Sequence, residues 1–337
     1  ILLIYHNNHL ELMLDSFGRN INYLRLSVTD RCDLRCKYCM PEKSSFYSKS
    51  DFLNLDDLKK ISFSLFDLGI RKIRITGGEP LIRKDILEFL EFLSFQKKKG
   101  LVDEILLTTN GTQLKKNALF LSSFGIKRIN VSLDSLISEK YSFITNGGDL
   151  SNVIDGIYEI NDKGIDVKIN TVLLKNFNED EILELVEWSS KNNFSLSFIE
   201  VMPIGDLNVK RINQYLPVEK AKKIIQKNFG LVPIKYKTNG PSRYFKTNKS
   251  KSVVGFISPI SNHFCETCNR IRITSAGILY GCLGHDSQVD LKPFLNKKNS
   301  DSLTNIIKET IFNKPEKHYF SIDSKSSVSR FMNTTGG

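Results

Sequence analysis

All six cysteines of the chain fall into two sets of three that lie far apart in the sequence. The first cysteine set is Cys32, Cys36 and Cys39, and the second cysteine set is Cys265, Cys268 and Cys282. Three thiolates can hold an iron–sulfur cluster and leave one iron open for a further ligand. The two sets therefore suggest chemistry at two metal clusters.

Disulfides and structural zinc are the alternatives for these cysteines. Six cysteines allow about fifteen disulfide pairings, but a chain of this size without a secretory signal does not need covalent links. A closed zinc site takes four Cys or His ligands, whereas each set supplies three. His263 and His285 lie close enough in sequence to complete the second set, so zinc stays open there.

The spacing of the first set, Cys-x-x-x-Cys-x-x-Cys with Tyr38 before the last cysteine, is the signature of the radical S-adenosylmethionine (SAM) superfamily. In that superfamily the loop follows the first strand of a barrel, and the open iron chelates the amino and carboxylate groups of SAM. A strand is expected directly before it, at residues 23 to 28. The run GGEP at residues 77–80 resembles the glycine-rich element of the superfamily, since glycines let the backbone approach a ligand closely.

Three segments repeat one local pattern, in which a helix ends at a glycine, an isoleucine follows and a β-branched strand begins. The glycines are Gly69, Gly125 and Gly164. Glycine suits the left-handed position that closes a helix, and the isoleucine packs back on it. The helix before Gly69 has apolar residues at 58, 61, 65 and 68, with Asn54 as its N-cap.

Six strands are expected to alternate with helices, at residues 23–28, 72–75, 105–109, 128–131, 167–170 and 194–200. This order favours an α/β fold with a parallel sheet, either a partial (β/α)6 TIM-type barrel or an open doubly wound sheet. After Met202 prolines punctuate shorter segments, and residues 253–257 and 271–274 indicate antiparallel strands. We expect a leader or extension at 1–17, a barrel at 18–210 and a smaller C-terminal layer at 211–337.

The composition is that of an ordinary globular protein, with 337 residues, 40% hydrophobic and 25% charged. No stretch approaches the roughly 20 apolar residues of a membrane span, so a cytoplasmic protein without a membrane partner is expected. The net charge of +11 is compatible with nucleic acid, a membrane surface or a small anion as partner, or with solubility alone. The run at 97–99 is interpreted as a solvated helix end.

The chain resembles the GTP 3′,8-cyclase family of molybdenum-cofactor biosynthesis over residues 18 to 337. The segments that carry the resemblance are LSVTDRC at 26–32, ITGGEPL at 75–81, TTNG at 108–111, NVSLD at 130–134, CETCNRIRIT at 265–274, GCL at 281–283 and the final Gly336 and Gly337. In combination these motifs are specific to that family.

The resemblance implies a cofactor set and a ligand set. Each cysteine set would hold a [4Fe-4S] cluster, and the second would lie in the C-terminal layer. The implied SAM contacts are Tyr38, Gly78, Ser132 and Met202. The implied GTP contacts are Arg25, Arg74, Thr108, Lys168, Arg270 and Arg272. Arginine suits phosphate because its planar fork donates two hydrogen bonds at once.

The implied reaction is radical cyclisation of GTP. In the family the first cluster reduces SAM, the resulting 5′-deoxyadenosyl radical takes hydrogen from ribose C3′, and the sugar radical attacks guanine C8. The second cluster ligates the guanine base, and the terminal glycines enter the active site. The implied partners are GTP, a reductant or electron-transfer protein and a downstream cyclic pyranopterin monophosphate synthase, with no nucleic acid; a homodimer is also considered.

Two positions depart from the family, which usually has arginine where this chain has Ser197 and isoleucine where it has Thr335. Altered affinity without loss of reaction is expected. The alternatives to the family are another two-cluster radical SAM enzyme, such as a peptide-modifying maturase, and a zinc-dependent nucleic-acid-binding protein. A maturase would usually have more than three C-terminal cysteines, and the zinc-protein hypothesis leaves the first cysteine set unexplained.

Overall fold

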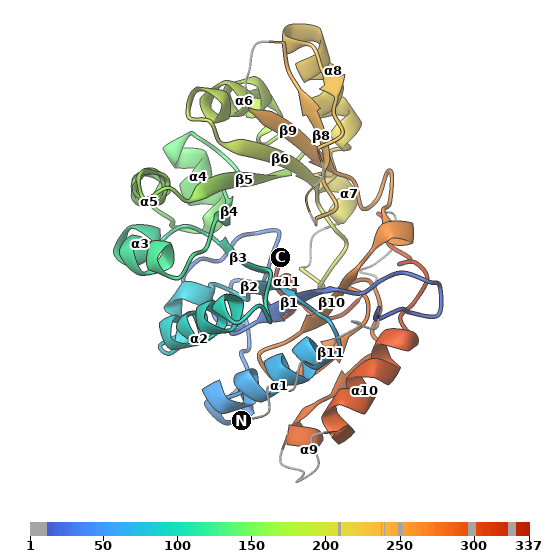
Figure 1. Cartoon of the computed structure of the whole chain (residues 1–337). Helices are drawn as coiled ribbons and strands as arrows, with labels where there is room; N and C mark the ends of the chain where they lie inside the picture. Colours follow the sequence, from blue (N-terminus) through green and yellow to red (C-terminus); the bar gives the residue numbers. More distant parts are fainter. Residues whose placement is uncertain are drawn as a thin grey trace.

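The structure is a computed structural model, and it describes residues 12–207, 210–236, 238, 240–248, 252–295, 301–322 and 328–337. Six parallel strands pair in chain order and form the middle of one sheet (Figure 1). They are β1 (Tyr23–Ser27), β2 (Lys72–Thr76), β3 (Glu104–Thr109), β4 (Arg128–Ser132), β5 (Asp166–Leu173) and β6 (Ser195–Glu200). All six expected strands are present.

Helices separate these strands and cover the outer face of the sheet (Figure 1). They are α1 (Leu55–Asp67), α2 (Ile86–Lys98), α3 (Leu114–Ser123), α4 (Ser138–Thr145), α5 (Leu150–Asp162) and α6 (Ile182–Lys191). The glycine–isoleucine prediction is confirmed at Gly69, which has φ +76°, and at Ile70, which is fully buried. Asn54 caps α1 as expected, by accepting a hydrogen bond from the Asp57 backbone N–H.

The C-terminal strands extend the same sheet at both of its edges. At one edge β9 (Val253–Ile257) is parallel to β6 and antiparallel to β8, while β10 (Arg270–Ile273) at the other is parallel to β1 and antiparallel to β11. The two expected antiparallel segments are thus antiparallel on one side only. The remaining strands are β7 (Val232–Pro233), β8 (Arg243–Lys246), β11 (Ile278–Tyr280) and β12 (Gln288–Asp290). The described strands form a curved, unclosed sheet, a partial barrel.

Short helices and turns complete the C-terminal part. They are α7 (Arg211–Gln214), α8 (Val218–Phe229), α9 (Lys292–Leu295), α10 (Asp301–Phe312) and α11 (Met332–Thr335), with 3-10 turns η1 (Lys49–Asp51), η2 (Pro80–Ile82), η3 (Glu179–Glu181) and η4 (Cys265–Thr267). Figure 1 shows α11 near the middle of the molecule, beside β1. Of the expected extension 1–17, residues 1–11 lie outside the described residues, and Met13 is buried.

The two faces of the parallel strands differ in polarity. Leu24 and Leu26 of β1 and Ile73 of β2 are fully buried in the apolar core. Arg25 and Arg74, which alternate with them, instead line a cavity inside the barrel. Apolar branched residues fill the interior of an ordinary TIM barrel, so charged residues there indicate a ligand site.

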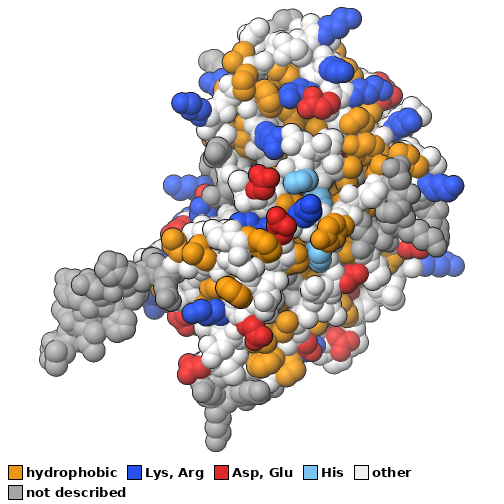
Figure 2. All heavy atoms as spheres, turned by 90° about the vertical axis from the view of Figure 1, so that its right-hand side faces the viewer, with side chains coloured by type: hydrophobic (Ala, Val, Ile, Leu, Met, Phe, Trp, Pro, Cys, Tyr) orange, Lys and Arg blue, Asp and Glu red, His pale blue; other side chains and the backbone are white. Residues whose placement is uncertain are grey.

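The outer surface carries charges of both signs. Figure 2 shows Lys and Arg side chains interspersed with Asp and Glu over the face it displays. No helix in the described ranges is long and apolar enough to cross a lipid bilayer.

Glu200, fully buried at the end of β6, joins the strand to two later segments. Its carboxylate accepts hydrogen bonds from the Val218 N–H at the start of α8, from the Tyr215 hydroxyl, and from the Ile260 and Ser261 N–H groups. The distances between donor nitrogen and acceptor oxygen are 3.2 Å for Val218 and 3.0 Å for both Ile260 and Ser261. One side chain thereby fixes α8 and the loop after β9 against the barrel.

We predict that Glu200→Ala destabilises the protein strongly, because it leaves several donors without an acceptor. The free energy of unfolding should fall by on the order of 3 kcal/mol, which corresponds to a Tm roughly 5–10 °C lower. Glu219→Ala removes an exposed carboxylate from α8 and is the control, with Tm within about 1 °C of the wild type. Equal Tm values for the two variants would contradict this role of Glu200.

Candidate active site

The first cysteine set lies on the loop after β1, as expected, and its three thiols are desolvated by burial. All three are free and half-buried. Burial raises the pKa of Cys32 to about 12 and that of Cys39 to about 11, and each thiol also feels neighbouring cysteines or carboxylates. Such thiols bind as thiolates only where a metal compensates their charge, which fits an iron–sulfur cluster as the compensating group.

The GGEP turn supports this loop through the backbone. The Gly78 N–H donates to the Thr29 carbonyl at 2.7 Å, and the Glu79 N–H donates to the Arg31 carbonyl at 2.8 Å. A Cβ atom on Gly78 would lie 2.2 Å from the Arg31 carbonyl oxygen, so only glycine fits. The close backbone approach predicted for these glycines is therefore made to the cysteine loop itself.

The Glu79 side chain also stabilises the GGEP turn. It is fully buried, and its carboxylate accepts from the Thr109 hydroxyl at 2.9 Å and from the Asn110 N–H at 2.7 Å. Burial raises the pKa of Glu79 to about 7 despite these bonds. The carboxylate thus ties the turn after β2 to the end of β3.

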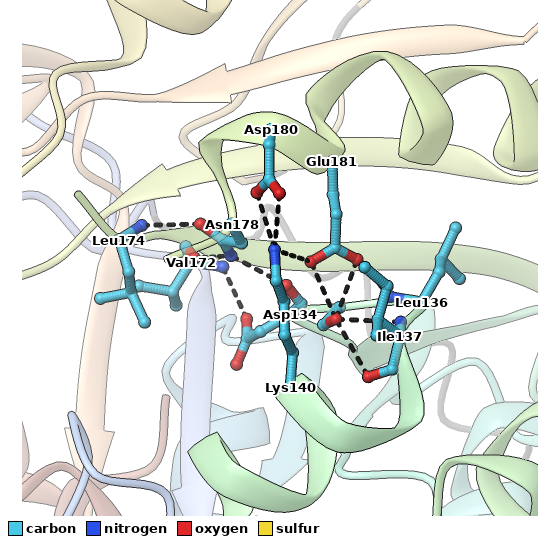
Figure 3. Close-up of polar contacts among 10 residues, drawn as sticks. Asp134, Leu136, Ile137, Lys140, Val172, Leu174, Asn178, Asp180 and Glu181 are labelled. Atoms are coloured by element: carbon cyan, nitrogen blue, oxygen red, sulfur yellow. Dashed lines mark hydrogen bonds and ion pairs between the residues drawn. The ribbon is translucent and has the colours of Figure 1, made fainter. Parts of the chain in front are cut away.

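Tyr38 is held at the end of β4 by a buried carboxylate. Its hydroxyl donates to Asp134 at 2.7 Å, while the other oxygen of Asp134 accepts from the Val172 N–H at 2.8 Å. Burial raises the pKa of Asp134 to about 6. The Asn178 amide donates to the carbonyls of both Asp134 and Val172 (Figure 3).

The neighbouring contacts in Figure 3 fasten the loop after β4 to η3. The Glu181 carboxylate accepts from the Ser135 hydroxyl at 2.8 Å and from the Leu136 N–H at 2.8 Å, and it forms an ion pair with Lys140. Tyr38 therefore rests on a rigid rim where β4 and β5 end.

The second cysteine set lies between η4 and the end of β11. Cys265 is buried, and each of the three thiols is free. Burial raises the pKa of the Cys268 thiol, but Arg270 and Lys314 outweigh it and bring that pKa to about 6. The Arg270 guanidinium donates to the Cys268 sulfur at 3.7 Å. A thiolate at neutral pH is the state in which cysteine binds metal, so this site fits a cluster as well.

Three histidines, His263, His285 and His318, lie near one another, and Figure 2 shows histidine side chains near the middle of its face. The His263 and His318 rings lie 6.1 Å apart, and His285 contacts the Lys317 carbonyl at 2.8 Å through Nε2. Within the described ranges, no three His, Cys, Asp or Glu side chains are gathered closely enough to bind a single metal ion.

The cavity inside the barrel lies beside the second cysteine set. The cysteines of the second set line it, and those of the first set do not. It is also lined by Met202 and by all six of the implied GTP contacts, Arg25, Arg74, Thr108, Lys168, Arg270 and Arg272. Three of the implied SAM contacts, Tyr38, Gly78 and Ser132, lie outside this lining.

The register of the sheet creates the positive charge of the cavity. Arg272 pairs with Arg25, and Arg25 pairs with Arg74, so three adjacent strands present arginine at one level. Burial, with the neighbouring Arg270, lowers the pKa of Arg272 to about 9, and burial also lowers that of Lys168. Such mutual repulsion destabilises the empty cavity and is relieved by a polyanion.

Hydrogen bonds orient these cations. Arg74 donates to the Tyr23 hydroxyl at 2.6 Å and to the Thr108 hydroxyl at 3.1 Å. Lys168 donates to the Tyr244 hydroxyl at 2.8 Å. The charged groups are therefore fixed before any ligand arrives.

The final glycines enter this cavity. Arg25 donates to the Gly337 carbonyl, and Arg272 donates to the Gly336 carbonyl at 2.7 Å. Gly336 has φ +75°, and a Cβ atom on it would lie 2.2 Å from the Thr76 side chain. Asn333 fixes the same segment by donating to the Asp30 carbonyl at 2.8 Å.

The two departures from the family are both fully buried. The Ser197 hydroxyl lies 2.9 Å from that of Ser242, beside Gly255, so its surroundings are filled by small residues. The Thr335 hydroxyl is buried without a hydrogen-bond partner. An aliphatic residue at 335 would avoid this unpaired group.

Sequence reasoning missed several residues of the cavity. Arg128, Asn130 and Asn170 line it from β4 and β5, and Lys314 and His318 line it from the segment after α10. Strand alternation could have found the first three, because they share a face with Ser132 and Lys168. Lys314 and His318 follow no such period.

Comparisons with known proteins agree with this geometry. The radical SAM superfamily matches residues 26–189, and the family described as Molybdenum Cofactor Synthesis C matches residues 194–320. A crystal structure of Streptococcus suis SuiB bound to S-adenosylmethionine has a TM-score of 0.61 at 17% identity, covering 90% of this chain and 77% of SuiB. SuiB bound to its precursor peptide SuiA has a TM-score of 0.62, covering 89% and 72%. The fold and the first cysteine set define a radical SAM enzyme, with SAM and iron–sulfur chemistry.

The curated relatives narrow this class. A GTP 3′,8-cyclase of Brucella ovis is 46% identical over 331 residues, which cover 97% of this chain and 96% of the relative. GTP 3′,8-cyclases of Brucella melitensis and Brucella abortus are 46% and 45% identical over the same length. The chain belongs to the GTP 3′,8-cyclase family. The maturase and zinc-protein alternatives are thereby set aside.

We predict that Gly336→Ala reduces turnover at least about tenfold, because the new Cβ displaces the segment from Thr76 and the cavity arginines. Gly100→Ala is the matched control, since Gly100 has φ +76° but open space around it. Activity per folded, iron-loaded protein should therefore fall in the first variant and persist in the second. Full activity in both variants would contradict the role of Gly336 beside Thr76, and an equal loss in both would assign the effect to backbone strain.

Proposed function

We propose that this chain converts GTP, with SAM and a reductant, to (8S)-3′,8-cyclo-7,8-dihydroguanosine 5′-triphosphate, 5′-deoxyadenosine and methionine. This reaction is the first step of molybdenum-cofactor biosynthesis. The observation that carries the proposal is the cationic cavity beside the second cysteine set, with arginines from β10, β1 and β2 at one level. Such a cavity suits a nucleoside triphosphate, and family membership names the reaction.

Two [4Fe-4S] clusters are part of the proposal. The first cysteine set would hold one of them, and the second cysteine set the other, each with an iron open to a ligand. When bound, the first cluster supplies the electron that cleaves SAM reductively, and the second offers its open iron to the guanine base. The low pKa of Cys268, about 6, supports metal ligation at the second set.

The protein side of the reaction is binding and orientation. Tyr38, Gly78, Ser132 and Met202 would contact SAM; the first three lie outside the cavity lining, while Met202 borders the cavity. Arg25, Arg74, Thr108 and Lys168 would contact the triphosphate and ribose, and Arg270 and Arg272 the part of GTP beside the second set. These fixed side chains would accelerate the reaction because they hold C3′ and C8 of GTP in the geometry for bond formation.

The electrons and atoms of the proposed reaction balance. One electron breaks the S–C5′ bond of SAM, and the carbon radical takes the hydrogen from C3′ to give 5′-deoxyadenosine. The C3′ radical then forms a bond to C8, and a second electron and a proton from the reductant complete the dihydroguanine. The product is therefore an isomer of GTP.

Further expectations belong to the same proposal. They are a cytoplasmic location, a low-potential reductant or electron-transfer protein, a downstream cyclic pyranopterin monophosphate synthase and a homodimer. The division into 1–17, 18–210 and 211–337 also stays a prediction.

The experiment that tests the function is anaerobic cluster reconstitution, followed by incubation with SAM, GTP and a strong reductant and mass spectrometry of the small molecules. We expect 5′-deoxyadenosine together with a new isomer of GTP. Cys282→Ala should lose about half of the bound iron and the new isomer, while Cys32→Ala should lose 5′-deoxyadenosine as well. Formation of 5′-deoxyadenosine by the wild type with GTP left intact would exclude the substrate, and uptake of zinc without iron would exclude the chemistry.

The family departures give a second test. Ser197→Arg and Thr335→Ile together should change GTP affinity and turnover by several-fold, because one adds a cation beside β5 and the other removes a buried unpaired hydroxyl. Steady-state kinetics with varied GTP measures both effects. Unchanged KM and kcat in the double variant would show that neither position matters for the substrate.

A further inference from the structure

Arg128 is a cation of the cavity that has no hydrogen-bond or ion-pair partner among the described residues. It is the first residue of β4, and its side chain lines the cavity. Its Nε atom is buried without a hydrogen-bond acceptor. Of the six arginines in the lining, Arg128 alone has no hydrogen bond or ion pair within the part of the chain that the structure describes.

The other arginines of the lining are already held by the protein. Arg19 pairs with Asp15, and Arg74 donates to Tyr23. The rest donate to sulfur or to backbone carbonyls, namely Arg25 to Gly337, Arg270 to Cys268 and Arg272 to Gly336. The guanidinium of Arg128 therefore has donors that no described residue uses.

The surroundings of Arg128 are cationic. Its charge contributes, after burial itself, to lowering the pKa of Lys168. Burial raises the pKa of the Tyr244 hydroxyl, but Lys168 and Arg128 outweigh it and lower that pKa overall. Arg128 pairs in register with Asp166, yet Asp166 is exposed and no ion pair joins the two described side chains.

An arginine without a counter-charge in cationic surroundings lowers the stability of the ligand-free protein. An ordinary structural arginine would be satisfied by a carboxylate or by carbonyls, and Arg128 has neither among the described residues. A multiply charged anion supplies the missing negative charge, and its oxygens match the geometry of the guanidinium donors.

Resting on the proposed function, we propose that Arg128 binds the phosphate end of the nucleotide, together with Lys168, and so helps set the preference for a triphosphate. It is a substrate-binding residue that the family resemblance did not imply. The guanine end, in contrast, lies toward the second cysteine set and should not depend on it.

The test compares three probes on the anaerobically reconstituted enzyme: GTP, guanosine and inorganic tripolyphosphate. Arg128→Gln should weaken GTP and tripolyphosphate about ten- to hundredfold, since a charge-assisted bond is lost, and leave guanosine within about twofold. Arg128→Lys should lie between. Lys127→Gln, which removes the same charge from an exposed neighbour, is the matched control and should leave all three affinities unchanged.

The Tm of the ligand-free variant distinguishes substrate binding from a purely structural role, because loss of a structural arginine would lower it. Because Arg128 has no partner, Arg128→Gln should leave the Tm of the ligand-free protein unchanged or higher. A large fall in Tm, or an equal loss of affinity for guanosine and GTP, would overturn the proposal, as would unchanged binding of GTP and tripolyphosphate. If Arg128→Gln does not fold, Arg128→Lys decides, with a several-fold loss expected.

The three probes test the role of Arg128 separately from the proposed function. A wild type that binds guanosine as tightly as GTP contradicts the assigned substrate. The tripolyphosphate arm still decides on Arg128 in that case, because it needs neither the base nor turnover.

Discussion

Positive charge that the protein does not neutralise by itself is the constraint on which this structure depends. The interior of the barrel holds arginine and lysine where an ordinary barrel has branched apolar side chains. The outer faces of the same strands are mostly apolar, so the helices pack on them normally and supply the stability. The fold can therefore keep a repulsive interior only because its hydrophobic core lies outside the barrel wall.

Buried carboxylates at the ends of alternate strands hold the rim of this interior. Glu79 follows β2, Asp134 follows β4 and Glu200 ends β6, and each accepts backbone N–H groups from a neighbouring segment. Their acceptor capacity is used by loops, so none of them neutralises the cavity. The rim is thus fixed by buried carboxylates whose oxygens bind backbone N–H groups, while the arginine and lysine of the interior keep their positive charge.

The sequence predicted the parts of this arrangement that are local. Strand alternation, the glycine–isoleucine turns and the cysteine spacings depend on residues within about ten positions of each other, and all of them appear in the structure. It did not predict that β9 would join β6 and β10 would join β1, because pairing partners some 60 and 250 residues apart leave no periodic trace. Arg128 was within reach of alternation, since it shares a face with Asn130 and Ser132.

The contacts of residues 328–337 also escaped prediction, for the same reason of distance. Arg330 donates to the carbonyl of Leu283 beside the second cysteine set, and Asn333 donates to the Asp30 carbonyl next to the first. The two partners of this short segment come from sequence positions about 250 residues apart.

That segment has a consequence for the order in which the protein matures. During translation both cysteine sets leave the ribosome before residues 328–337 do, so for a time each set exists without its final contact. A chain interrupted before residue 328 would carry all six cysteines yet lack the hydrogen bonds from Arg330 to the Leu283 carbonyl and from Asn333 to the Asp30 carbonyl.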